Sequence, residues 1–235
     1  MTTVVFWDID GTLLTTARAG VFALEEAARE VCGGEVDFAA LKTAGLTDWE
    51  VALLSIRTAG REPTPETASA FLRVYERHLP DRLHWRQGRV LPGVTEALDQ
   101  LSGRADVSNL LLTGNTRAGA SAKLAHYGLE GYFADGAFCE DGDDRTAIAH
   151  RGLALARERS NGAVDPEHVI VIGDTPHDVR CGLAIGARTI AVASGTYAEA
   201  DLAESGAWTT LPQLPPAGEM VRLLGLAQGN ASGQR

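Results

Sequence analysis

The sequence has few cysteines, few aromatic residues and no long apolar run. Its three cysteines, Cys32, Cys139 and Cys181, lack the spacing of metal ligands, and their odd number favours free thiols over a disulfide framework. The aromatic residues, 6% of the chain, are dispersed and form no stripe on which bases could stack. The longest apolar runs, such as residues 107–112, are far shorter than the roughly 20 residues of a membrane-spanning helix.

Basic residues are also in the minority. The chain has 21 lysines and arginines against 31 aspartates and glutamates, which gives a net charge of −10 with neutral histidines. No basic run interrupts this acidic balance, so binding to a nucleic-acid backbone or to an anionic membrane is disfavoured. The first residues contain neither a basic region nor a cleavage site typical of a signal peptide. We therefore expect a cytoplasmic protein with no nucleic-acid partner and no membrane attachment.

Apolar residues make up 45% of the 235 residues, which is enough for a large core. Strand-like apolar runs, each followed by an amphipathic stretch, recur along the sequence. This alternation is typical of a parallel sheet covered by helices, so the expected fold class is α/β. The expected strands are 3–8, 108–112, 168–172 and 188–193, with shorter ones at 132–133 and 207–209. Helices are expected at 94–101, 116–127 and 176–186, and from 146 onward.

One region breaks the alternation. Between about residues 15 and 87, helical patterns at 20–31, 48–58 and 65–78 occur without a convincing strand. We therefore expect an α/β core of residues 1–14 and 90–227 that carries an inserted, all-helical domain of residues 15–89. The low-complexity tail, residues 228–235, is expected to be disordered.

The first chemically informative motif ends the first strand. Asp8 and Asp10 are two residues apart, so on a strand their carboxylates point to the same side. Two neighbouring anions are tolerated if a cation lies between them or if one keeps its proton, which would provide a nucleophile beside an acid. Gly11 then permits a sharp turn or a close approach to an anion. A plain Asp-Gly turn after a core strand is the simpler interpretation of the same residues.

Two further strand ends carry polar residues. Thr113, Gly114 and Asn115 follow an apolar strand and precede a helix, which suits an anion site, although a simple connection capped by Thr116 would have the same sequence. Asp174 follows another apolar strand, and Asp178 lies in the first turn of the next helix. An acidic first turn complements the helix dipole, which explains Asp178 but not Asp174. Carboxylates without histidine or cysteine partners indicate a hard cation such as Mg²⁺.

These motifs resemble a known family. The segment Asp8-Ile9-Asp10-Gly11-Thr12, Thr113 after an apolar strand, and the segment Gly173-Asp174-Thr175-Pro176-His177-Asp178 resemble motifs one, two and four of the haloacid dehalogenase superfamily of phosphohydrolases, in order and in spacing. The helical insertion is similar to the C1 cap of the phosphoglycolate phosphatase and β-phosphoglucomutase branch. The resemblance implies a Rossmann-like sheet with helices on both faces.

The third motif of that family is a lysine or arginine, often in a Lys-Pro sequence, and this chain has no Lys-Pro and no lysine after Lys123. The cation must then be an arginine. Arg145, just before an expected helix, resembles the corresponding position. Arg151, one and a half helical turns further on, is the alternative.

The resemblance also implies roles for individual residues. Asp8 would be the nucleophile, Asp10 the acid and base, and Thr113 and Arg145 would hold the phosphoryl oxygens. The cation Mg²⁺ would be held by Asp8, the Asp10 carbonyl group and Asp174, with Asp178 beside it. The remaining residues expected to bind phosphate or substrate are Gly11, Gly114, Asn115 and, in a loop of the cap, Gly45, Thr47 and Asp48.

The expected function is therefore that of a magnesium-dependent phosphatase, active as a monomer or a homodimer on a small phosphorylated metabolite through an aspartyl-phosphate intermediate. Asp10 favours phosphate-ester chemistry over halide displacement, because a departing alkoxide needs a proton and a halide does not. A phosphomutase of the β-phosphoglucomutase type is an alternative with the same core. A non-catalytic module that binds a phosphorylated ligand is a second alternative.

Overall fold

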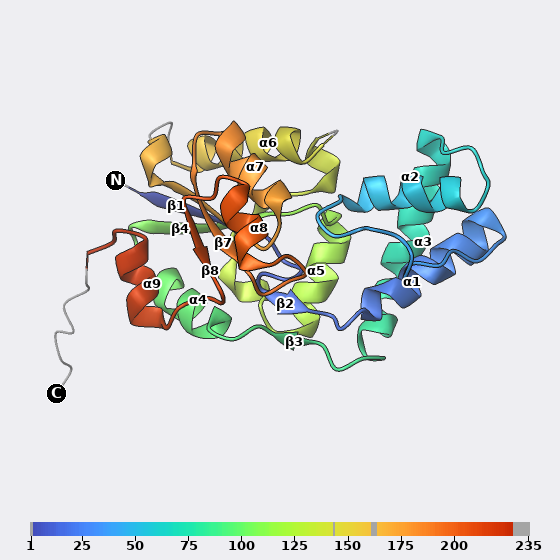
Figure 1. The fold of residues 1–235 in the computed structure, drawn as a ribbon, viewed down its shortest axis with the longest axis horizontal. Coiled ribbons are helices and arrows are strands. Elements are labelled where there is room, and N and C mark those ends of the chain that lie inside the picture. Colours follow the sequence, from blue (N-terminus) through green and yellow to red (C-terminus); the bar gives the residue numbers. More distant parts are fainter. Residues whose placement is uncertain (1, 143, 161–163, 228–235) are drawn as a thin grey trace.

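The structure is a computed structural model, and it describes residues 2–142, 144–160 and 164–227. The described part of the chain forms a six-stranded parallel sheet with the strand order β5-β4-β1-β6-β7-β8 (Figure 1). The strands are β1 (Thr3–Trp7), β4 (Val107–Leu112), β5 (Gly136–Ala137), β6 (Val169–Gly173), β7 (Arg188–Val192) and β8 (Thr209–Leu211). The α/β prediction is confirmed. The expected tail at 228–235 lies outside the described residues.

Helices cover both faces of this sheet (Figure 1). The helices α4 (Val94–Ser102), α5 (Arg117–His126) and α9 (Ala217–Leu223) lie on one face, and α6 (Arg145–Arg159) and α7 (Pro176–Ala184) lie on the other, while α8 (Glu199–Glu204) packs beside β7 and β8. Alternate residues of β1 enter the two layers: Val5 and Trp7 pack with α4, whereas Val4 and Phe6 pack with α6. All four side chains are fully buried, which explains why the strand has a continuous apolar sequence.

A second hydrophobic cluster belongs to a group of helices beside the carboxyl ends of the strands (Figure 1). This helical unit consists of α1 (Ala19–Ala27), its π-helical continuation η1 (Ala28–Cys32), α2 (Asp48–Thr58) and α3 (Pro65–Leu83). The apolar residues Phe71, Tyr75 and Leu79 of α3 lie in its interior. The chain enters through β2 (Leu14–Thr15) and leaves through β3 (Arg89–Val90), and these two short strands pair with each other.

Because neighbouring strands β4, β1 and β6 run in the same direction, their carboxyl ends lie next to one another. The helices that connect the strands change face at β1. On one side of β1, α4 and α5 lead to β4 and β5 on one face of the sheet; on the other side, α6 and α7 flank β6 on the opposite face. Such a reversal opens a crevice at the carboxyl edge of a parallel sheet. No helix among the described residues is long and apolar enough to cross a lipid bilayer.

Several expected element boundaries are wrong. Residues 132–133 are not a strand: η2 (Glu130–Tyr132) is a 3₁₀ turn, and the edge strand is the two-residue β5, too short to leave an apolar pattern. The last strand starts at Thr209, two residues later than expected. The expected helix 65–78 continues through Pro80 to Leu83, since Leu79 and Leu83 are both fully buried in the helical unit.

Proline in the interior of α3 costs a backbone hydrogen bond. Pro80 is exposed and has no N–H group, so we expect Pro80→Ala to raise the free energy of unfolding by about 1–3 kcal/mol. The control is Pro65→Ala, because proline fits the first position of the same helix and its replacement should bring no gain. Thermal unfolding of both variants measures the difference, and an unchanged or lowered melting temperature for Pro80→Ala would contradict the expectation.

Candidate active site

An acidic cluster lies at the carboxyl edge of the sheet. Asp8 follows β1, Asp174 follows β6, and Asp178 lies in the first turn of α7. One carboxylate oxygen of each lies within 4.8 Å of the others, and all three residues are buried. Burial and the neighbouring carboxylates raise the pKa of Asp8 to about 7 and that of Asp174 to about 9. The cluster therefore carries more negative charge than its surroundings compensate.

The guanidinium group of Arg145 is the cation beside this cluster. Its Nη2 atom lies 3.5 Å from Asp8 Oδ1 and forms an ion pair with Asp178 Oδ1. Burial opposes its charge, but Asp178 and Asp8 raise its pKa further, so it stays protonated. Arg151 is instead exposed and pairs with Glu158 at 3.2 Å. Of the two expected arginines, the structure brings only Arg145 to the cluster.

The cluster fits an oxygen-coordinated divalent cation. Asp178 is already engaged: its Oδ2 atom accepts hydrogen bonds from the Thr175 N–H and hydroxyl groups at 3.0 and 2.7 Å, and its Oδ1 atom faces Arg145. Asp8 and Asp174 are left with the uncompensated charge, and carboxylate oxygens without softer ligands suit Mg²⁺. The Thr12 hydroxyl donates to Asp174 Oδ1 at 3.2 Å, a contact that the sequence analysis missed.

Glycine is required where the backbone passes the cluster. Gly11 has a φ of 85°, and a Cβ atom there would overlap the Asp174 carboxylate. A Cβ atom at Gly195, in the loop after β7, would overlap the same carboxylate. These two close approaches restrict the space around the Asp174 carboxylate.

A second set of polar contacts surrounds Asp10. Its Oδ2 atom accepts hydrogen bonds from Asn115 Nδ2 at 2.9 Å and from Lys123 Nζ at 2.5 Å. Asn115 Nδ2 also donates to the Thr113 hydroxyl at 2.9 Å. Lys123 was missed in the sequence analysis. The available signal was its position: it shares the buried face of α5 with Ala120 and Leu124, where an apolar residue would be expected.

The loop of residues 43–48 connects the helical unit to the sheet edge, and we call it the docking loop. The Asp48 N–H group donates to the Gly114 carbonyl at 2.7 Å, and Asp48 Oδ2 accepts from the Thr116 N–H group at 2.8 Å. Thr47 caps α2 in a capping box with Glu50. Burial raises the pKa of Asp48 to about 6. Its carboxylate therefore binds the start of α5, and its expected contact with substrate stays a prediction.

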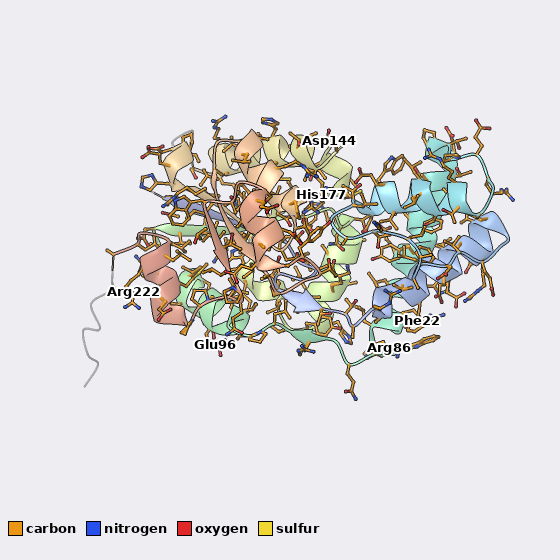
Figure 2. All side chains as sticks on the ribbon, in the orientation of Figure 1. Phe22, Arg86, Glu96, Asp144, His177 and Arg222 are labelled. Carbon is orange, nitrogen blue, oxygen red and sulfur yellow. The ribbon has the colours of Figure 1, made fainter. Side chains whose placement is uncertain are left out.

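Close packing accompanies these hydrogen bonds. Gly45 has a φ of 80°, and a Cβ atom there would overlap the ring of His177, which Figure 2 labels on the side of the core that faces the helical unit. Trp49 directly follows the docking loop in the sequence, and its N–H group donates to Cys139 Sγ at 3.3 Å. All three cysteines are free and buried, in agreement with the sequence analysis.

A cavity of about 450 Å³ lies between the sheet edge and the helical unit. Nine of the expected site residues line it: Asp8, Asp10, Gly11, Gly45, Asp48, Gly114, Asn115, Arg145 and Asp174. The other three, Thr47, Thr113 and Asp178, are buried next to these residues. Apolar side chains of the helical unit, among them Val21, Leu24 and Val51, complete the wall. One end of the cavity, at the sheet, is therefore charged. The other end, at the helices, is lined by both polar and apolar residues, and we call it the mixed end.

Comparison with solved structures finds the same fold. A predicted phosphatase from Clostridium acetobutylicum has a TM-score of 0.72 at 18% identity, covering 96% of this chain and 100% of that one. A predicted phosphoglycolate phosphatase from Haemophilus somnus has a TM-score of 0.71 at 14% identity, covering 94% and 97%. A proposed β-phosphoglucomutase from Bacteroides vulgatus has a TM-score of 0.69 at 20% identity, covering 97% and 91%.

No curated protein matches the sequence significantly. A family model does: it describes haloacid dehalogenase-like hydrolases and matches residues 2–186, a span that runs from β1 through α7 and so contains every residue of the acidic cluster. The protein belongs to the haloacid dehalogenase-like hydrolase family.

Proposed function

We propose that this hydrolase is a phosphatase that cleaves a small phosphorylated metabolite through an aspartyl-phosphate on Asp8. The observation that carries the proposal is the pairing of Asp8 with Arg145 at the charged end of a cavity: the arginine side chain is only 11% exposed, and its Nη2 atom lies 3.5 Å from Asp8 Oδ1. A phosphoryl group that enters there meets a carboxylate nucleophile and a cation that can neutralise its oxygens. The similar folds described as phosphatases support the same reaction class.

The proposed reaction has two steps. A carboxylate oxygen of Asp8 attacks phosphorus, the ester P–O bond breaks, and its electron pair leaves with the departing oxygen, which takes a proton from Asp10. A water molecule then gives a proton to Asp10 and attacks the phosphorus of the aspartyl-phosphate. This releases inorganic phosphate and restores both carboxyl groups. Arg145 and the Thr113 hydroxyl stabilise the phosphoryl oxygens in both steps.

Magnesium is the proposed cofactor. Asp8, Asp174 and the Asp10 carbonyl group would hold it, with Asp178 at their side, and the bound ion would neutralise charge on the phosphoryl group and on Asp8. The packing of three buried carboxylates against the single guanidinium group of Arg145 supports a further cation at this place.

We further propose that residues 15–89 form a cap over a catalytic core of residues 1–14 and 90–227. Paired β2 and β3 are the two linkers, and the docking loop is the contact that closes the cap. Closure of this kind excludes water from the phosphoryl site and presents the mixed end of the cavity to the rest of the substrate.

The nucleophile is tested with Asp8→Asn, which should lower turnover by at least about 10³-fold, because an amide is a poor nucleophile. The exposed Asp37→Asn is the matched control and should keep full activity. Rapid acid quenching and borohydride reduction of the working enzyme should convert residue 8 to homoserine, detected by peptide mass. Turnover without this product would refute the aspartyl-phosphate, and transfer of the phosphoryl group to an added sugar phosphate would favour a phosphomutase.

The cation site is tested by protein stability in chelator. Asp8 and Asp174 have raised pKa values in the folded protein, so it binds more protons than the unfolded chain, and the free energy of unfolding should fall as pH rises from about 4 towards 9. Added Mg²⁺ should reverse this loss. Asp174→Asn removes the free-energy cost of neutralising this carboxyl group on folding, so it should raise the metal-free melting temperature at pH 8, by about 2–4 °C for each kcal/mol gained.

The exposed Asp81→Asn is the control for this experiment and should respond to Mg²⁺ as the unmodified protein does. The assignment fails if the metal-free protein becomes more stable as pH rises, or if Mg²⁺ stabilises Asp174→Asn equally well.

The cap is tested with Asp48→Ala, which deletes the carboxylate that accepts from the Thr116 N–H group. A lost hydrogen bond to a charged group is worth about 1.5–3 kcal/mol, so kcat/KM should fall by about 10-fold or more for a substrate that fills the cavity and much less for a small aryl phosphate. Glu66→Ala is the control, since Glu66 lies in the first turn of α3 and is exposed. An equal loss for both substrates would limit Asp48 to starting a helix.

A further inference from the structure

Lys123 is a buried cation that the proposed reaction does not use. It lies on α5, its side chain is only 7% exposed, and it lines the cavity. Burial of an ammonium group without partners is costly, so its neighbours must compensate for it. Burial opposes the charge of Lys123, but the nearby Asp10, Tyr75 and Asp48 raise its pKa, and it stays protonated. Tyr75 and Asp48 belong to the helical unit, so the charge lies where the two parts of the protein meet.

The contacts of Lys123 form a closed triangle with Asp10 and Asn115. Lys123 Nζ lies 2.5 Å from Asp10 Oδ2 and 2.5 Å from Asn115 Oδ1, and Asn115 Nδ2 lies 2.9 Å from Asp10 Oδ2. The lysine thus fixes the orientation of the amide, with its oxygen towards the ammonium group and its nitrogen towards the carboxylate. Lys123 holds Asp10 directly and a second time through Asn115.

The triangle makes the two oxygens of Asp10 unequal. Oδ2 accepts hydrogen bonds from two donors, so it has no room for a proton of its own. Oδ1 has no hydrogen-bond partner among the described residues, and the Asp10 side chain is 43% exposed where it lines the cavity. A proton carried by Asp10 therefore belongs on Oδ1, the atom that remains available to a ligand.

We propose that Lys123 is a positioning residue for proton transfer: by anchoring Asp10 Oδ2, it keeps the proton on Oδ1 and directs it to the leaving oxygen of the substrate. This inference rests on the proposed phosphatase function. In the first step, the Oδ1–H bond breaks as the bond between hydrogen and the leaving oxygen forms, and Lys123 keeps all of its protons. The two cations of the site then have separate roles: Arg145 faces the nucleophile Asp8, and Lys123 faces the proton donor Asp10.

The kinetic test compares leaving groups. Lys123→Met keeps the apolar stem and removes the charge, so kcat for an alkyl phosphate should fall by about 10–100-fold. An aryl phosphate with a good leaving group needs little protonation and should lose less than about 3-fold, and KM should change little for both. Lys42→Met is the matched control, because Lys42 is exposed and is the other lysine of the chain. Added methylamine should restore part of the alkyl-phosphate rate of Lys123→Ala.

A second measurement is independent of turnover. Because the chain has two lysines, ¹⁵N-labelled lysine should produce one slowly exchanging ammonium signal, from buried Lys123. Asp10→Asn should shift or broaden this signal, whereas the exposed Asp37→Asn should leave it in place.

The outcomes separate the two proposals. Equal losses for alkyl and aryl phosphates, or a rise in KM with kcat unchanged, would overturn the positioning role while leaving the phosphatase function in place. An ammonium signal that does not change in Asp10→Asn would also overturn the positioning role, because the contact between Lys123 and Asp10 would then be absent in solution. If the signal responds but no ester releases phosphate, the phosphatase function fails, and the role of Lys123 in it fails too.

Discussion

Repulsion between carboxylates at one edge of the sheet is the constraint on which the rest of the structure depends. Parallel strands bring Asp8 and Asp174 together, the start of α7 adds Asp178, and burial removes the water that would screen them. Such a cluster is tolerable only if cations are supplied. Arg145 is therefore placed at the first position of α6, and the charge that remains explains the preference for a divalent ion under the proposed function.

The same principle organises the neighbouring contacts. Asp10 points to the cavity and is balanced by Lys123, which approaches from α5. Asp48 is half-buried between the two parts of the protein and accepts a hydrogen bond from the Thr116 N–H group. Each of these carboxylates thus has a donor: Arg145 serves both Asp8 and Asp178, and α5 with its N-cap supplies the donors to Asp10 and Asp48. A change in one element is consequently felt as a charge imbalance at the cavity.

The sequence predicted the α/β fold, the strand-end positions of Asp8 and Asp174 and the place of Arg145 beside the start of a helix, because the ends of strands and helices are local features that keep their pattern in the chain. It could not predict the contact between Lys123 and Asp10, which are 113 positions apart and meet only after β1 and α5 pack. It also could not predict the contact of Asp48 with the Thr116 N–H group, since nothing local shows that the start of α5 lies within reach. The helix was expected to end at residue 78, but it continues past Pro80 because burial of Leu83 outweighs the lost hydrogen bond.

The pairing of β2 with β3 has an evolutionary consequence. The helical unit is preceded by β2 and followed by β3, and these two strands lie side by side, so its two ends are joined by backbone hydrogen bonds whatever lies between them. A helical unit of another size or shape could be exchanged at this junction without altering the register of the central sheet. Under the proposed function, the residues that perform the chemistry and the residues that choose the metabolite could then diverge separately, one gene segment at a time.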